Sequence, residues 1–212
     1  MDVFSFRDQL QERLKEQLPG EEAHLRALPV HRPLSSEAKK QAALDYRASA
    51  VAILLYPEAN ALKSVLIQRP NYDGAHGGQV SFPGGKMDPT DRDLEMTARR
   101  ECFEEIGYPM HQGQLLGALT EVFIPVSKFL VQPYVFFEEN LPPLTNDERE
   151  VAEIISFDVA QFAQMDIQQT TIELQHGMRL NHVPYFPIEN RIVWGATAIM
   201  LAEFQEVLRR IG

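Results

Sequence analysis

The chain has 212 residues, 44% hydrophobic and 24% charged, as is usual for a globular protein with a sizeable core. Its net charge of −10 excludes a broad basic surface for nucleic acid and argues against a membrane-surface protein, and one cysteine excludes a disulfide framework and a cysteine zinc site. No apolar run approaches the roughly 18 residues of a membrane span, and the charged N-terminus lacks a signal-peptide core. We expect a cytoplasmic protein without nucleic-acid or membrane partners.

The N-terminal part, residues 1–47, is expected to belong to the same folding unit as the rest. Residues 3–18 predict an amphipathic helix, because apolar residues recur every four positions: Phe6, Leu10, Leu14 and Leu18. This helix packs on the domain or on a second subunit, so it offers a surface for a homodimer. Residues 21–47 show little periodicity and predict a surface connection.

The remainder, residues 48–212, predicts one mixed α/β domain in which strands alternate with helices. Apolar, β-rich runs predict strands at 48–56, 63–69, 80–82, 114–124, 129–137 and 152–157, with two or three weaker strands through residue 193. Helices are predicted at roughly 93–106, near 158–164 and at about 195–210. Residues 70–79 and the Pro83-Gly84-Gly85 segment predict loops, because glycine and proline interrupt the pattern.

The helix predicted at 93–106 carries an acidic cluster. Glu101 and Glu105 are four residues apart and therefore lie on one helical face, with Glu104 beside them. Each pair of like-charged neighbours costs roughly 0.2–0.5 kcal/mol, and a divalent cation would turn this repulsion into binding. Asp91 or Asp93 can cap the helix start.

The loop before this helix ends in Phe-Pro-Gly-Gly. Gly84 and Gly85 permit a close backbone approach just before the helix. The backbone at this helix N-terminus is therefore a candidate binding position for a phosphate group. Magnesium prefers one or two carboxylates together with substrate phosphate and water. The two features together indicate a metal-assisted phosphate site.

This segment resembles the Nudix box, G-x5-E-x7-R-E-U-x-E-E-x-G-U, where U is a bulky apolar residue. Residues 100–108, RECFEEIGY, match the second half in register. The first half departs from the pattern: the interval from Gly85 to Arg100 is one residue longer, and the expected glutamate falls on Arg92. Asp91 or Asp93 takes the role of that glutamate, or neither does.

Further segments resemble the coenzyme A pyrophosphatase subfamily. Residues 76–85, HGGQVSFPGG, are similar to its H-x-G-Q-V-x-F-P-G-G signature, preceded by Arg69. Residues 127–133, 150–153 and 194–198 resemble its later motifs. Two positions depart from the signature: Pro70 replaces a small residue, and Gly74 replaces a second arginine. Lys86 or Lys128 compensates for that arginine, or the substrate differs.

The resemblance implies a Nudix-type α/β/α sandwich with a mixed β-sheet and an added N-terminal helix. It implies metal-dependent hydrolysis of a diphosphate linkage in a nucleotide substrate, here coenzyme A or acyl-coenzyme A. Another substrate such as ADP-ribose or a dinucleotide is the alternative, and a non-catalytic nucleotide-binding module is a third.

The resemblance also implies roles for individual residues. Glu101 and Glu105 are expected to bind Mg²⁺ or Mn²⁺, with Glu104 as a further ligand or as the activator of water, so that Glu104 and Glu105 form the catalytic pair. Arg100 is expected to orient the acidic cluster. The general base stays open, with Glu148 and Glu150 as further candidates. The residues expected to contact substrate are Arg69, His76, Gln79, Gly84, Gly85 and Lys86, of which His76 either borders the substrate or supports the glycine turn.

Overall fold

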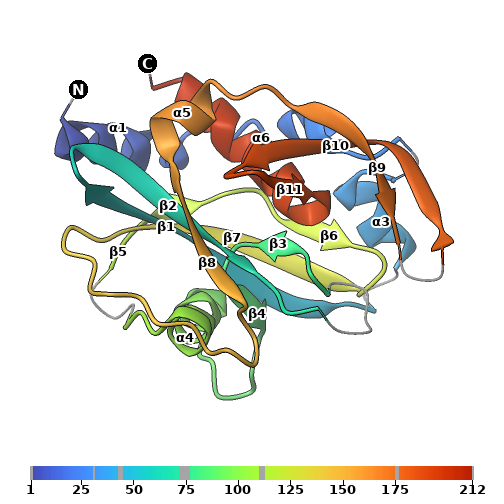
Figure 1. Ribbon diagram of the computed structural model, residues 1–212, viewed down its shortest axis with the longest axis horizontal. Coiled ribbons are helices and arrows are strands. Elements are labelled where there is room, and N and C mark those ends of the chain that lie inside the picture. The colour runs from blue at the N-terminus through green and yellow to red at the C-terminus, as the bar shows by residue number, and fades with distance from the viewer. Residues whose placement is uncertain are drawn as a thin grey trace.

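The computed structural model describes residues 2–30, 32–42, 45–71, 77–109, 113–174 and 177–211. Its centre is a mixed sheet (Figure 1), built from β1 (Arg47–Glu58), β2 (Ala61–Gln68), β3 (Val80–Ser81), β4 (Gly84–Lys86), β5 (Gln114–Ala118), β6 (Val122–Ile124), β7 (Phe129–Phe137) and β8 (Glu153–Asp158). The strands β1 and β7 pair in parallel, and the other pairings are antiparallel. The expected mixed sheet is confirmed.

The two faces of the sheet carry separate apolar clusters because side chains alternate along each strand. On β1, Ile53 and Leu55 face the cluster that includes the C-terminal helix α6 (Gly195–Arg209). The intervening residue Leu54 faces the acidic helix α4 (Leu94–Ile106). Figure 1 shows α4 on one side of the sheet and α1 and α6 on the other, which confirms the expected α/β/α sandwich.

Helix α4 begins and ends at the residues that the sequence indicates. Asp93 is the N-cap, and its carboxylate accepts a hydrogen bond of 2.8 Å from the Met96 amide. Gly107 ends the helix in the left-handed conformation, with φ of 70°. Ala98, Cys102 and Ile106 are fully buried against the sheet.

The expected surface connection at 21–47 is wrong in part, because this segment contains helices and buried residues. Helix α1 (Val3–Lys15) is followed by α2 (Glu21–His24), the 3-10 helix η1 (Leu25–Ala27) and α3 (Ser35–Gln41). His24 is 1% exposed, and its Nε2 lies 3.1 Å from the carboxylate of Glu203 on α6. A hydrogen bond with a residue 179 positions away is a tertiary contact that local periodicity does not reveal.

Two strand predictions need correction. The run at 114–124 forms two strands, β5 and β6, rather than one. The Gly84–Gly85 segment, predicted as a loop, is the short strand β4 and pairs with β1. The weaker strands predicted through residue 193 are confirmed: β9 (Gln168–Glu173), β10 (Arg179–Ile188) and β11 (Arg191–Trp194) form a second sheet, and α5 (Val159–Ala163) precedes them.

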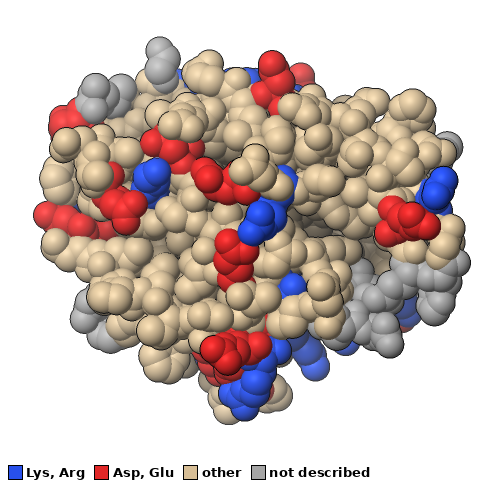
Figure 2. All heavy atoms as spheres, viewed as in Figure 1, with Lys and Arg blue, Asp and Glu red and all other residues tan. Residues whose placement is uncertain are grey.

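The surface carries its charges in small mixed groups. On the face in Figure 2, acidic and basic side chains alternate without forming one broad basic area. Within the described ranges, no helix combines the length and the apolar character that crossing a membrane requires.

The carboxylate of Glu203 joins the N-terminal segment to the core, so we predict that Glu203→Ala is strongly destabilising. Glu203 is fully buried and accepts hydrogen bonds from the Gly20 and Thr120 amides, each of 2.9 Å, and from the Thr120 hydroxyl. Removing it leaves these donors unpaired, at a cost of roughly 2–4 kcal/mol in the free energy of unfolding, measurable by urea denaturation. Glu206→Ala, one turn later on the surface, is the control and should unfold at nearly the wild-type urea concentration.

Candidate active site

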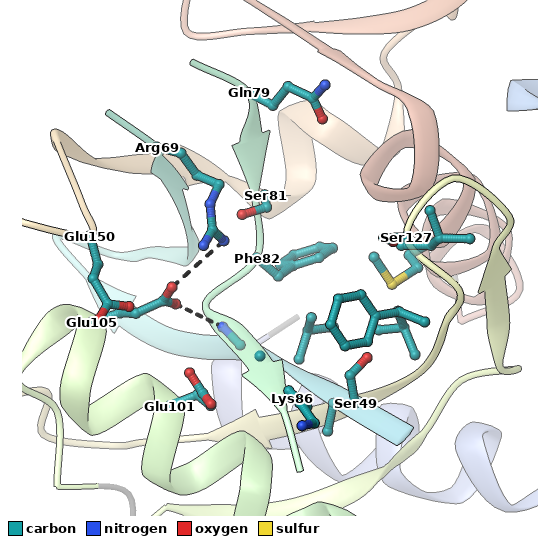
Figure 3. Close-up of a pocket in the computed structure, with 18 residues that line it drawn as sticks. Ser49, Arg69, Gln79, Ser81, Phe82, Lys86, Glu101, Glu105, Ser127 and Glu150 are labelled. Atoms are coloured by element: carbon teal, nitrogen blue, oxygen red, sulfur yellow. Dashed lines mark hydrogen bonds and ion pairs between the residues drawn. The ribbon is translucent and has the colours of Figure 1, made fainter. Parts of the chain in front are cut away.

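A pocket of about 420 Å³ opens beside the N-terminal end of β4. One end is charged and holds Arg69 together with the carboxylates of Glu101, Glu105 and Glu150. The other end is mainly apolar and is lined by Phe82, Ile124, Phe129, Val131 and Met200. Figure 3 shows the carboxylates on one side of the pocket and Ser49 and Ser127 on the other.

Glu105 is the most deeply buried carboxylate of the site, at 1% exposure. The Gly84 amide donates a hydrogen bond of 2.8 Å to its Oε2, and Nη1 of Arg69 lies 3.8 Å from its Oε1. Burial raises the pKa of Glu105 to about 8, against the lowering effects of Gly84 and Arg69 and with the help of neighbouring carboxylates. The side chain is therefore held in place without enough positive charge to offset its burial.

Glu101 lies one helical turn before Glu105 and is partly buried. Burial raises its pKa, while the ion pair with Arg100 opposes that shift. The close approach of Glu101 to β4 requires glycine, because a Cβ atom on Gly85 would lie 2.5 Å from the Glu101 carboxylate. A Cβ on Gly84 would lie 2.3 Å from the Ala50 carbonyl oxygen. Gly85 therefore lets α4 approach β4, and Gly84 lets β4 approach β1.

Arg100 orients the acidic cluster, as the sequence predicts. It donates to both carboxylate oxygens of Asp91, at 3.0 and 2.9 Å, and to Glu101 at 2.9 Å. Asp91 is buried and also accepts hydrogen bonds from the Thr97 hydroxyl and the Asp88 amide. Asp91 thus takes the place of the expected glutamate, and Asp93 is the helix cap instead.

Glu104 lies at the outer side of the cluster. Its side chain is 52% exposed and pairs with Arg100 at 2.8 Å, and it does not line the pocket. The structure therefore brings Glu101 and Glu105 together in the pocket, with Glu104 outside it.

The residues expected to contact substrate converge on the same pocket. Arg69, Gln79, Gly84, Gly85 and Lys86 all line it. His76 and Gly74 lie outside the described residues. The loop and the helix, which are separate features in the sequence, form the walls of one cavity.

Glu150 is the lining carboxylate that sequence reasoning left open as one of several candidates. It lies at the charged end of the pocket, immediately before the buried Val151, and it contributes to raising the pKa of Glu105. Glu148, the other loop candidate, is exposed and does not line the pocket. Ser81 and Ser127 also line the pocket; both lie in segments with a motif, 76–85 and 127–133, but neither was expected to contact substrate.

The donor set at the charged end fits a divalent cation of the magnesium type. Oxygen ligands from one or two carboxylates, completed by phosphate and water, are what Mg²⁺ prefers. In the described part of the chain no three acidic, histidine or cysteine side chains form a ready-made metal cluster. Glu101 and Glu105 therefore fit a metal that shares its coordination sphere with a phosphorylated ligand.

We predict that Glu105→Gln stabilises the metal-free protein at alkaline pH. The folded-state pKa of about 8 lies above the ordinary value of 4.5, so wild-type stability declines as pH rises between these values. A glutamine does not ionise in this range, so the stability of the variant does not decline for this reason. Thermal unfolding with a chelator should give a higher Tm for the variant at pH 9 and similar values at pH 5.

Added Mg²⁺ should then raise the Tm of the wild type and leave that of Glu105→Gln unchanged. If the Tm of both proteins depends on pH and Mg²⁺ in the same way, the description of Glu105 as a buried carboxylate that lacks a cation is contradicted.

A second prediction concerns Asp91. The hydrogen bond from Arg100 lowers the pKa of Asp91 to about 2, so the carboxylate stays charged at neutral pH. Asp91→Ala removes the buried carboxylate that accepts two hydrogen bonds from Arg100 and one from Thr97, and we expect the free energy of unfolding to fall by roughly 2–4 kcal/mol. Asp88→Ala, at an exposed position nearby, should change the urea midpoint much less. Equal changes in the urea midpoint for the two variants would contradict the role of Asp91 as the buried partner of Arg100.

Comparison with known proteins places these features in a family. The NUDIX domain family matches residues 45–175. The chain is 33% identical over 159 residues to uncharacterized Nudix hydrolases NudL of Yersinia pestis (strain Pestoides F) and Yersinia pseudotuberculosis (strain IP 31758), covering 71% of this chain and 73% of each relative.

Solved structures support the fold. The Nudix hydrolase RenU from M. smegmatis has a TM-score of 0.54 at 18% identity, covering 78% of this chain and 88% of that one. A MutT/nudix family protein from Enterococcus faecalis has a TM-score of 0.51 at 16% identity, covering 89% and 74%. The two structures show the fold, and the family match together with the NudL relatives establishes that the chain belongs to the Nudix hydrolases, a family of pyrophosphohydrolases that typically use a divalent metal ion.

Proposed function

We propose that this protein hydrolyses the diphosphate linkage of coenzyme A or acyl-coenzyme A to 3′,5′-ADP and 4′-phosphopantetheine or its acyl form. The observation that carries the proposal is the meeting of Glu101, Glu105 and Arg69 beside the Gly84–Gly85 backbone in one pocket. Hydrolysis of a diphosphate requires carboxylates that bind the metal ion and cationic groups that bind the phosphates. The choice of coenzyme A rests on the residue pattern at 69–85 and 127–133.

In this proposal, Mg²⁺ or Mn²⁺ is held by Glu101 and Glu105. A bound divalent ion would supply charge neutralisation at the phosphate oxygens and a lower pKa for its water. Glu104 is held by Arg100 at the rim and serves as a further ligand or water activator only after releasing that partner. Glu150 is the better placed candidate for a general base, since it lies inside the pocket.

The phosphate groups are proposed to contact the basic and backbone groups around the carboxylates. Arg69 is already oriented toward Glu105, and its guanidinium presents several donors in a fork that suits phosphate oxygens. Gln79 and Lys86 also line the pocket, on opposite sides of it in Figure 3. Gly84 and Gly85 keep the backbone close to the metal position, because any side chain there would occupy space now held by Glu101 or β1.

The proposed unit includes the N-terminal residues 1–47 together with the domain at 48–212. Leu10 and Leu14 of α1 are buried within this single chain, and Ala27 packs in the cluster that contains α6. This packing supports intramolecular docking of the helix, and a homodimer through the same apolar residues would have to displace it.

A substrate panel tests the proposal. Initial rates with coenzyme A, acetyl-coenzyme A, ADP-ribose and NADH, each with Mg²⁺ or Mn²⁺, should be highest for a coenzyme A compound. Glu105→Gln should lower kcat by at least about a hundredfold, the scale of losing a major electrostatic contribution. Glu95→Gln on the same helix, whose carboxylate pairs with Arg99 outside the pocket, is the matched control and should retain activity.

Preference for ADP-ribose or NADH would reject the coenzyme A assignment and favour the alternative class of diphosphate substrate. Metal-dependent nucleotide binding without any turnover would instead indicate a non-catalytic module. Full activity in Glu105→Gln would reject the assigned site.

A further inference from the structure

One row of polar side chains extends the pocket floor beyond the charged end. Arg47 and Ser49 are two residues apart on β1, so they point to the same face of the sheet. Ser49 lies directly opposite Lys86 on β4 and opposite Val131 on β7. Ser49, Lys86 and Val131 line the pocket, and Arg47 lies at its edge, in contact with the lining residues Phe129 and Ser127. Figure 3 shows Ser49 and Lys86 on the side away from Glu105 and Glu150.

Arg47 is fixed in position by two contacts. Its guanidinium lies 4.2 Å from the ring centroid of Phe129, its opposite residue on β7. Its Nη2 donates a hydrogen bond of 2.6 Å to the Ser127 carbonyl oxygen. Stacking and a backbone hydrogen bond reduce the freedom of a side chain that would otherwise move in solvent. The remaining donors of this guanidinium are therefore presented at the edge of the pocket in a nearly fixed orientation.

The positive charges of Arg47 and Lys86 have no carboxylate partner in the described part of the chain, although Arg47 contacts Phe129 and Ser127. Throughout the described residues, no ion pair includes either side chain, whereas the neighbouring Lys128 is paired with Asp45. Arg47 and Lys86 are diagonal neighbours across β1 and β4, a relation that separates residues by roughly 7–8 Å. Ser49 lies on β1 opposite Lys86, and its hydroxyl donates only a long hydrogen bond, of 3.4 Å, to the Leu130 carbonyl oxygen. Two cations and a hydroxyl on neighbouring strands are groups that can together bind one phosphate.

We propose that Arg47, Ser49 and Lys86 form a second anion subsite that binds a phosphomonoester of the substrate, separate from the diphosphate at Glu101 and Glu105. The inference rests on the proposed function and deepens it, because it selects nucleoside diphosphate derivatives that carry an additional 3′-phosphate. A phosphomonoester near pH 7 carries a charge of about −1.5 to −2 and three acceptor oxygens, which suit an arginine fork and a lysine. In a chain with net charge −10, this local pair of cations offsets repulsion of such a substrate.

The test compares ligands that differ only in that phosphate. Binding of adenosine 3′,5′-bisphosphate and adenosine 5′-monophosphate to the Mg²⁺-loaded protein is measured by calorimetry, and kcat/KM is measured for coenzyme A and dephospho-coenzyme A. The wild type should prefer the 3′-phosphorylated member of each pair by about tenfold or more, equivalent to about 1.4 kcal/mol. Arg47→Gln and Ser49→Ala should reduce this preference at least fivefold while changing binding of the monophosphate less than twofold.

Arg7→Gln is the matched control, because Arg7 also stacks on phenylalanine rings, those of Phe4 and Phe137, away from the pocket. It should keep the full preference. Equal affinity of the wild type for the two nucleotides, or a preference that survives in Arg47→Gln, overturns the subsite. An Arg47-dependent preference for the bisphosphate in a protein that hydrolyses neither coenzyme supports the subsite and refutes the proposed reaction, so the two failures are distinguishable.

Discussion

The close approach of helix α4 to strand β4 is the constraint on which the site depends. Gly85 leaves no side chain between the strand and the helix, so the Glu101 carboxylate occupies the space beside it, and Gly84, which packs on β1, donates its amide to Glu105. The strand in turn pairs with β1, the central strand of the sheet. The carboxylates are thereby attached to the most deeply packed part of the protein, which keeps their positions fixed when a ligand enters.

The same approach creates an electrostatic imbalance that a cation relieves. Glu105 is buried with one amide donor and a distant guanidinium, and its raised pKa records that deficit. Arg100 supplies positive charge to the neighbouring acidic groups, but its donors are directed to Asp91, Glu101 and Glu104 rather than to Glu105. The protein therefore organises one part of the acidic cluster internally and leaves the pocket side for a metal ion and phosphate.

Much of this arrangement could be predicted from the sequence, because its signals are local. The spacing of Glu101 and Glu105, the Asp93 cap and the Gly107 stop are consecutive features of one helix, and the structure confirms that helix. The strand at 129–137 was predicted to the residue, since it is a continuous apolar run. The glycines before the helix correctly indicated a close backbone approach. They also led to the prediction of a loop where the structure has strand β4, because these three residues form a strand only by pairing with β1.

The features that were missed or left open depend on long-range contacts. The burial of His24 requires Glu203, and the fold brings Glu150 to the pocket from a loop that is 45 residues beyond Glu105 in the chain. Asp91 lies six residues after Gly85, and the first glutamate of the Nudix box likewise lies six residues after its glycine. Counting backward from Arg100 reaches Arg92 instead, and only the contacts with Arg100 and Thr97 decide between the two registers.

The most direct test of the account is Mn²⁺ binding to Gly85→Ala, followed by electron paramagnetic resonance. The added methyl would meet the far end of the flexible Glu101 side chain, so the fold should persist while the carboxylate is displaced. The account predicts a Tm within a few degrees of the wild type and Mn²⁺ affinity at least about tenfold weaker, the scale on which a disturbed ligand shell acts. Unchanged Mn²⁺ affinity in a folded Gly85→Ala protein would contradict the claim that the glycine-permitted approach of α4 to β4 builds the metal site.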